Sequence, residues 1–203
     1  MGVAKRLSGG FRTTLLDFDG FGKTPEPNFP MTVSDYAAKV ETLMAELGIS
    51  SAVFVAHSFG GRVALEIAAR RPHLCQKLVL IDSAGMRPRR GLKYYLKVFL
   101  HKLRCRLGLR GLSGSKDYAA LSPVMRETFK NVVNYNQKPL LSHIYVTTAI
   151  FWGKSDRETK PYMARVLHKK IQGSALFWLD GGHFAYIEDF AKFFAILWAF
   201  VAD

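Results

Sequence analysis

The sequence predicts an α/β fold, a mostly parallel sheet with helices on both faces, interrupted by one helical insertion. Short apolar strand patterns alternate with helix patterns along the chain, and this alternation is typical of parallel β-α-β units. The length of 203 residues suits one domain, so we expect residues 1–203 to form a single domain. Hydrophobic residues make up 49% and charged residues 22%, which are ordinary proportions for a globular chain.

The first 70 residues contain two strand patterns and two helix patterns. Residues 11–18 are rich in apolar and β-branched side chains and run into a glycine loop, which predicts a strand. Thr32 is a suitable N-cap for a helix that Gly48 would end. Residues 51–56 have the composition of a buried strand, and residues 59–70 follow with apolar side chains at helical spacing.

The rest of the chain continues the same alternation. Strands are expected at residues 77–81, 144–150 and 175–179, and helices at residues 161–170 and from Glu188 to the end. We expect Glu188 to cap this last helix, because a carboxylate is stabilising at a helix N-terminus.

Residues 86–143 interrupt this alternation of strands and helices. They contain a basic amphipathic helix with leucines at three- and four-residue spacing, and then a second helix near residues 124–134. Open parallel sheets bind ligands beyond the carboxyl ends of their strands, where an insertion between two strands would lie. The sequence therefore predicts a helical lid.

The basic charge is concentrated in this insertion. The net charge is +13, and nine lysines and arginines with no acidic residue lie within residues 87–110. The rest of the chain carries 20 basic and 16 acidic side chains, so no general affinity for nucleic acid is expected. The basic helix lies on a solvated lid surface, or it attracts an anionic substrate or the anionic lipid of a membrane surface. Contact of this helix with nucleic acid is the third alternative, and it is disfavoured because the bases are not interleaved with aromatic side chains.

Several classes of protein are disfavoured by composition. No apolar run reaches the roughly 18 residues that a membrane-spanning helix needs. Two cysteines provide no disulfide framework, and the first ten residues lack the apolar core of a signal peptide, so a cytoplasmic location is expected. The sequence shows no ligand set for a metal or a nucleotide, and we expect no cofactor.

A candidate nucleophile lies at the junction of the strand at residues 51–56 and the helix at residues 59–70. A sharp strand-to-helix turn there would expose the Ser58 hydroxyl above the sheet, with the small residues Ala56 and Gly60 allowing close approach. The N–H of Phe59 would lie at the helix N-terminus, where it could stabilise an oxyanion.

A serine hydroxyl needs a general base and an orienting carboxylate. His183 and Asp156 each follow a predicted strand, so both are expected at the same sheet edge as Ser58. Asp82 also follows a strand and is a lesser candidate for the acid. His57, next to the serine, is expected to point elsewhere. The order serine, aspartate, histidine along the chain is that of one particular fold.

Four motifs carry a family resemblance: AHSFGG at residues 56–61, LDFDGFGKT at 16–24, FWGKSD at 151–156 and GGHFAYIED at 181–189. Together they resemble the α/β-hydrolase fold, specifically its serine hydrolases with a helical lid. The resemblance implies that Ser58 is the nucleophile, His183 the general base and then acid, Asp156 the residue that fixes the imidazole tautomer, and Phe59 an oxyanion-hole donor.

The same resemblance implies that the chain is N-terminally truncated. In the family, a loop such as residues 17–24 follows the fourth strand, and a loop after the third strand, often with His-Gly, supplies a second oxyanion donor. This chain contains no His-Gly pair. We therefore expect a fragment or a shortened chain, in which the loss of one donor lowers kcat by about 10² to 10³.

These observations predict a cofactor-free serine hydrolase that cleaves a carboxylic ester or related acyl bond of a small molecule through an acyl-serine intermediate. The alternative is a catalytically impaired, hydrolase-like protein or fragment that binds a ligand or a partner. The sequence leaves the acyl length and the oligomeric state open.

Overall fold

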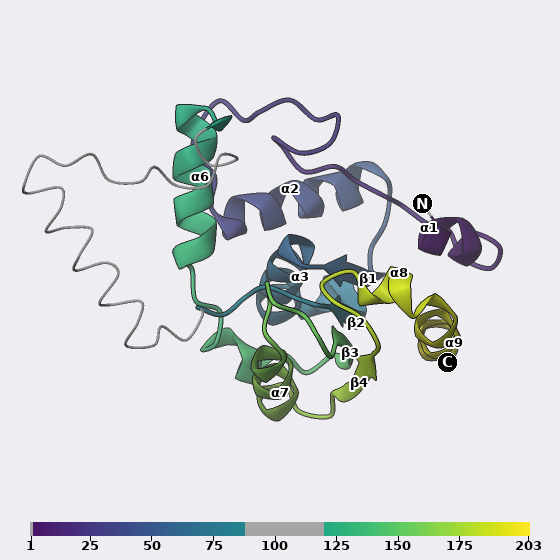
Figure 1. Ribbon diagram of the computed structural model, residues 1–203. Coiled ribbons are helices and arrows are strands. Elements are labelled where there is room, and N and C mark those ends of the chain that lie inside the picture. The colour runs from purple at the N-terminus through teal and green to yellow at the C-terminus, as the bar shows by residue number, and fades with distance from the viewer. Residues whose placement is uncertain (1, 88–119) are drawn as a thin grey trace, which may run out of the picture.

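The computed structural model describes residues 2–87 and 120–203. Within them, four parallel strands form one sheet in the order β1-β2-β3-β4 (Figure 1). The strands are β1 (Ala52–His57), β2 (Cys75–Ile81), β3 (Thr147–Gly153) and β4 (Ala175–Leu179). All four carboxyl ends therefore face the same edge, and the α/β class predicted from the sequence is confirmed.

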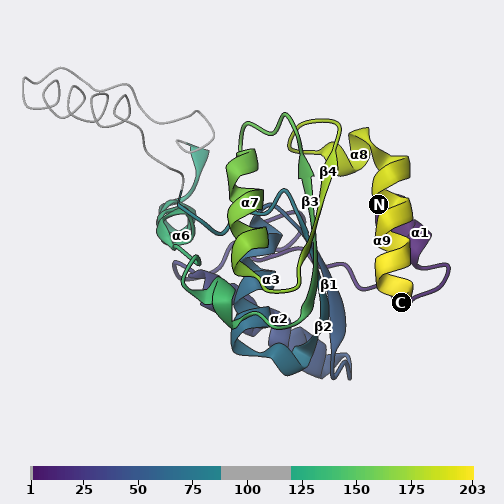
Figure 2. The same cartoon turned by 90° about the horizontal axis from the view of Figure 1, so that it is seen from below.

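Helices cover both faces of the sheet (Figure 2). On one face lie α3 (Phe59–Arg70) and α7 (Pro161–Lys170), which pack on the alternate β2 and β3 side chains that include Leu80 and Trp152. On the other face, α1 (Gly2–Leu7) and α9 (Phe190–Ala202) enclose Phe151 and its neighbours. This double coverage explains why the central strands are apolar at nearly every position.

A further layer lies outside α3. It consists of α2 (Val33–Glu46) and α6 (Pro123–Asn134), which share an apolar cluster with α3. Thr32 caps α2 in a reciprocal capping box with Asp35, as the sequence predicts for Thr32. The side chain of Thr128 in α6 accepts a hydrogen bond of 2.9 Å from the N–H of Met31, so α6 is tied to the entrance of α2.

The prediction of a strand at residues 11–18 is wrong. The structure shows neither helix nor strand there, and Leu15 is 66% exposed. Within the described residues, β1 pairs with β2 alone and presents no strand on its other side. A strand pattern becomes a strand only where a neighbouring backbone accepts its hydrogen bonds, and residues 11–18 have no such neighbour here.

Smaller corrections concern element ends. The strand predicted at residues 144–150 begins at Thr147 and continues to Gly153, and the short 3-10 helix η2 (Leu140–His143) precedes it. A second 3-10 helix, η1 (Pro72–Leu74), precedes β2. The last helix begins at Phe190 instead of Glu188, after a separate turn, α8 (Ala185–Glu188).

Most of the predicted lid, including the basic helix, falls on residues 88–119, outside the described residues. The predictions of a lid and of contact with anionic lipid therefore stay predictions. In the two described ranges, no helix combines the length and the apolar character needed to cross a membrane.

Candidate active site

Ser58 occupies a strained turn between β1 and α3. Its φ of 50° and ψ of −112° are unusual for a residue with a side chain. The surrounding sheet holds this conformation, since Ser58 N–H donates to the carbonyl of Ile81 at 3.0 Å and its own carbonyl accepts from Ala84 at 3.0 Å. The turn lifts the hydroxyl above the carboxyl ends of the strands, as the sequence predicts.

The tight approach at this turn involves a different glycine from the one predicted. A Cβ built on Gly60 would lie 3.9 Å from the Cβ of Ala56, which is an ordinary contact. A Cβ on Gly61 would lie 2.7 Å from the Cβ of Ser83, a distance that side chains do not tolerate. Gly61 is therefore the position in α3 that has no room for a side chain.

His183 reaches Ser58 from the opposite edge of the sheet. It follows β4, whereas Ser58 follows β1, so the loop at residues 180–183 has to cross the ends of β2 and β3. Gly153 allows the crossing, because any Cβ there would collide with the carbonyl of Gly182. The amide of Ser155 then donates to the carbonyl of Gly181 at 2.9 Å and secures the loop over β3.

The three predicted side chains meet at the end of this loop. His183 Nε2 lies 2.9 Å from Ser58 Oγ, and His183 Nδ1 lies 2.9 Å from Asp156 Oδ2. The side chains of His183 and Asp156 are 8% and 0% exposed. A carboxylate can only accept, so Nδ1 carries the proton and Nε2 is free to accept the hydrogen of Ser58.

Asp156 is held as a carboxylate by several donors. Its Oδ1 accepts from the amides of Glu158 at 2.7 Å and Thr159 at 3.1 Å, and its Oδ2 also accepts from the Thr159 hydroxyl at 2.6 Å. Burial alone would raise the pKa of Asp156, but the hydrogen bonds from His183, Thr159 and Glu158 outweigh it and lower that pKa. The group is thus negative where it faces the imidazole.

Phe59 begins α3 directly after Ser58. The N–H of a first helical residue has no acceptor within its own helix, so it is available to a negatively charged oxygen beside Ser58. The ring of Phe59 stacks on Phe21 of the glycine loop, with centroids 5.2 Å apart. That contact fixes the start of α3 against the loop.

Glu188 has a different place from the predicted one. Asp189, not Glu188, precedes α9, and no side-chain bond caps that helix. The Glu188 carboxylate instead accepts from the amide of Gly182 at 3.2 Å. The prediction that Glu188 caps the last helix is therefore wrong, and its carboxylate supports the loop that carries His183.

Asp82, the lesser candidate for the acid, lies fully buried behind the three side chains. Its Oδ1 accepts from the amide of Gly153 at 2.8 Å, while its Oδ2 has no partner among the described residues. Burial, together with the nearby carboxylates of Asp156 and Glu188, raises the pKa of Asp82 to about 8, although the hydrogen bond from Gly153 opposes the rise. Asp156, and not Asp82, is the carboxylate that contacts His183.

Replacing Asp82 with asparagine is expected to stabilise the protein increasingly as the pH rises. The folded carboxyl keeps its proton up to about pH 8, whereas the unfolded one loses it near 3.8. The wild type therefore loses stability between these values, by up to about 1.4 kcal/mol per pH unit, and asparagine does not. Urea unfolding at pH 5, 6, 7 and 8 measures the difference in free energy of unfolding between the two proteins.

The control for this prediction is Asp180→Asn. Asp180 is exposed beside Lys154, which lowers its pKa, so it is ionised throughout this pH range whether folded or unfolded. A plot of the free energy of unfolding of Asp180→Asn against pH should run parallel to that of the wild type. A parallel curve for Asp82→Asn would show that Asp82 is ionised in the folded protein at pH 5.

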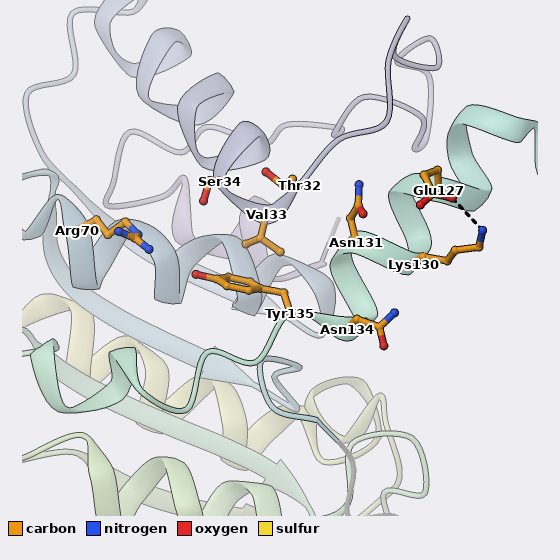
Figure 3. Close-up of a pocket in the computed structure, with 9 residues that line it drawn as sticks. All are labelled: Thr32, Val33, Ser34, Arg70, Glu127, Lys130, Asn131, Asn134 and Tyr135. Carbon is orange, nitrogen blue, oxygen red and sulfur yellow. Dashed lines mark hydrogen bonds and ion pairs between the residues drawn. The ribbon is translucent and has the colours of Figure 1, made fainter. Parts of the chain in front are cut away.

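A cavity in the described residues lies elsewhere, between α2, α3 and α6 (Figure 3). Its volume is about 620 Å³. Its charged walls are already paired, since Arg70 bonds Glu66 at 2.6 Å and Lys130 bonds Glu127 at 2.8 Å. Neither Ser58 nor His183 lines it.

The fold and the comparisons together define the class of this protein: it has the architecture of a hydrolase-fold enzyme. The family model described as the alpha/beta hydrolase fold matches residues 1–104. The chain belongs to the α/β-hydrolase family, as the resemblance of its motifs implies.

Individual relatives are distant. An uncharacterized protein of Mycobacterium tuberculosis is 25% identical over 98% of this chain and 70% of its own length. The enol-lactonase of Burkholderia xenovorans superposes with a TM-score of 0.75 at 24% identity, covering 98% of this chain and 84% of that one. An esterase of Exiguobacterium antarcticum superposes with a TM-score of 0.71 at 21% identity, covering 92% and 80%. At these identities the two structures show the fold.

Proposed function

We propose that this protein is a serine hydrolase that cleaves a carboxylic ester or a related acyl bond through an acyl intermediate on Ser58. The observation that carries the proposal is the 2.9 Å contact between Ser58 Oγ and His183 Nε2. The family supports it, as do the folds shared with an enol-lactonase and an esterase, whose names both denote ester-bond chemistry.

In the first half of the proposed reaction, His183 Nε2 accepts the proton of Ser58 while Oγ attacks the carbonyl carbon of the substrate. The carbonyl oxygen becomes an oxyanion, which the N–H of Phe59 stabilises. The C–O bond to the leaving group then breaks, and the imidazolium of His183 returns its proton to the leaving oxygen. The product of this half is an ester of Ser58.

In the second half, water replaces the leaving group. His183 takes a proton from the water, whose oxygen attacks the acyl carbon, and the bond to Ser58 Oγ breaks as Oγ regains a proton. Asp156 stabilises the imidazolium in both halves and keeps Nδ1 protonated when the ring is neutral. No cofactor enters the scheme.

A fluorophosphonate probe tests this proposal, since it reacts with activated serines. We expect the folded wild type to be labelled once, at Ser58 by peptide mapping, and Ser58→Ala to be unlabelled. Ser51→Ala is the matched control, because Ser51 lies before the opposite end of β1; its labelling should equal that of the wild type. A folded wild type without labelling, or equal labelling of Ser58→Ala, would favour the alternative of a non-catalytic binding protein.

A further inference from the structure

We propose that His57 is a positioning residue for His183: its imidazole donates a hydrogen bond to the backbone carbonyl of His183 and holds the general base against Ser58. This inference rests on the proposed function, because it assigns a role to a neighbour of the same three side chains.

The contact between the two histidines is short and has a defined direction. His57 Nε2 lies 2.7 Å from the carbonyl oxygen of His183. A carbonyl oxygen only accepts, so Nε2 of His57 must carry a hydrogen. Burial lowers the pKa of His57, despite the opposing effect of the carbonyl. This direction favours a neutral ring with its single hydrogen on Nε2, although the carboxylates of Asp156 and Glu158 oppose the shift.

The loop that carries His183 needs a support on this side of the sheet. It starts at β4, and two of its anchors lie near its starting point: the amide of Ser155 holds Gly181, and Glu188 holds Gly182. His183 lies further along, where the loop has crossed to β1. The bond from His57 is made at this far end, to the backbone of the same residue that contacts Ser58.

Ring contacts hold the imidazole of His57 in place. Its centroid lies 4.8 Å from that of His183, 5.2 Å from Phe184 and 5.1 Å from Tyr186. Tyr186 belongs to α8, and its ring contacts His57 at the end of β1 although α8 follows β4 in sequence. The His57 side chain thus has packing on three rings as well as one directional bond.

The adjacency of His57 and Ser58 gives the bond its importance. Both residues lie on the same rigid turn at the end of β1. The hydrogen bond from His57 to the carbonyl of His183 and the contact of Ser58 with His183 Nε2 therefore both join this turn to His183. If the hydrogen bond from His57 is lost, the backbone of His183 can move away from Ser58. Displacements of about 1 Å between reacting groups cost about 10²-fold in rate.

Two substitutions separate the hydrogen bond from the packing. His57→Phe keeps a ring against Phe184 and Tyr186 but has no donor, and we expect kcat to fall about 10- to 100-fold with KM unchanged. His57→Gln places an amide N–H near the position of Nε2, and we expect it to keep kcat within about threefold. The exposed His143→Gln is the control and should match the wild type.

The rate of fluorophosphonate labelling provides a second readout, which should fall in parallel with kcat because it depends on the Ser58 and His183 contact. Equal kcat values for His57→Phe and the wild type, or an equal loss in His57→Gln and His57→Phe, would overturn the proposal. A folded wild type that is never labelled would instead contradict the proposed function.

A measurement on the wild type keeps the test independent of folding in the variants. Nitrogen-15 NMR of labelled histidines should show His57 neutral at pH 7 with its hydrogen on Nε2. A hydrogen on Nδ1, or a charged ring, would contradict the bond to the carbonyl of His183.

Discussion

Replacing His183 with alanine is expected to lower kcat by about 10⁶-fold, because removal of the general base from a nucleophile-base pair costs about as much as removal of the whole set. His183 Nε2 lies 2.9 Å from Ser58 Oγ, and no other imidazole nitrogen in the described residues bonds that oxygen. Without it, the hydroxyl proton has no acceptor of suitable pKa. Hydrolysis of a neutral aryl ester under single-turnover conditions measures the loss.

The control is His143→Ala, since His143 is exposed and precedes the amino end of β3, whereas the site lies at the carboxyl ends of the strands. It should retain the activity of the wild type. Urea unfolding of His183→Ala establishes that the variant is folded, because the removed side chain is largely buried. Activity in a folded His183→Ala within tenfold of the wild type would show that another group accepts the proton.

Replacing Asp156 with asparagine is expected to lower kcat by about 10⁴-fold while leaving the fold intact. The amides of Glu158 and Thr159 both donate to Oδ1, so the carbonyl oxygen of an asparagine would occupy that place. Its amino group would then face His183 Nδ1, where the carboxylate now accepts. An amino group donates, so Nδ1 would become the acceptor and the ring hydrogen would move to Nε2.

This change of tautomer is the reason for the size of the effect. With a hydrogen on Nε2, His183 cannot accept the proton of Ser58, although the distances hardly change. Kinetics on a neutral ester measure the loss, and nitrogen-15 NMR of His183 should show its hydrogen on Nε2 in Asp156→Asn and on Nδ1 in the wild type. An unchanged tautomer together with unchanged kcat would contradict the role proposed for Asp156.

Much of the candidate site could be predicted because its signals are local. The turn at Ser58 is marked by a buried strand, small residues and a helix within a few positions of one another. His183 and Asp156 each follow a strand, and the carboxyl ends of parallel strands necessarily share an edge. The sequence could not choose firmly between Asp156 and Asp82, since both satisfy this condition.

The contributions of His57 and Glu188 were missed for a physical reason. Both act on the loop at residues 180–183. The path of this loop depends on the order of the four strands and on the missing side chain at Gly153, and the sequence near His57 and Glu188 indicates neither. His57 was expected to point elsewhere, but the crossing loop brings the carbonyl of His183 to its ring. The available signal was a histidine at the end of the nucleophile strand.

By itself, the sequence determined helices α2, α3, α6, α7 and α9, four of the strands and the edge at which the site lies, because apolar periodicity and capping residues act over a few positions. Helices α1 and α8 were not predicted. The tertiary structure decided that residues 11–18 form no strand, that Asp156 and not Asp82 contacts the imidazole, and that the loop at residues 180–183 spans the sheet. These outcomes depend on which segments become neighbours. A strand needs a neighbouring strand, and a carboxylate needs a donor within reach. Where these lie far apart in the sequence, the packing of the folded chain decides which of them meet.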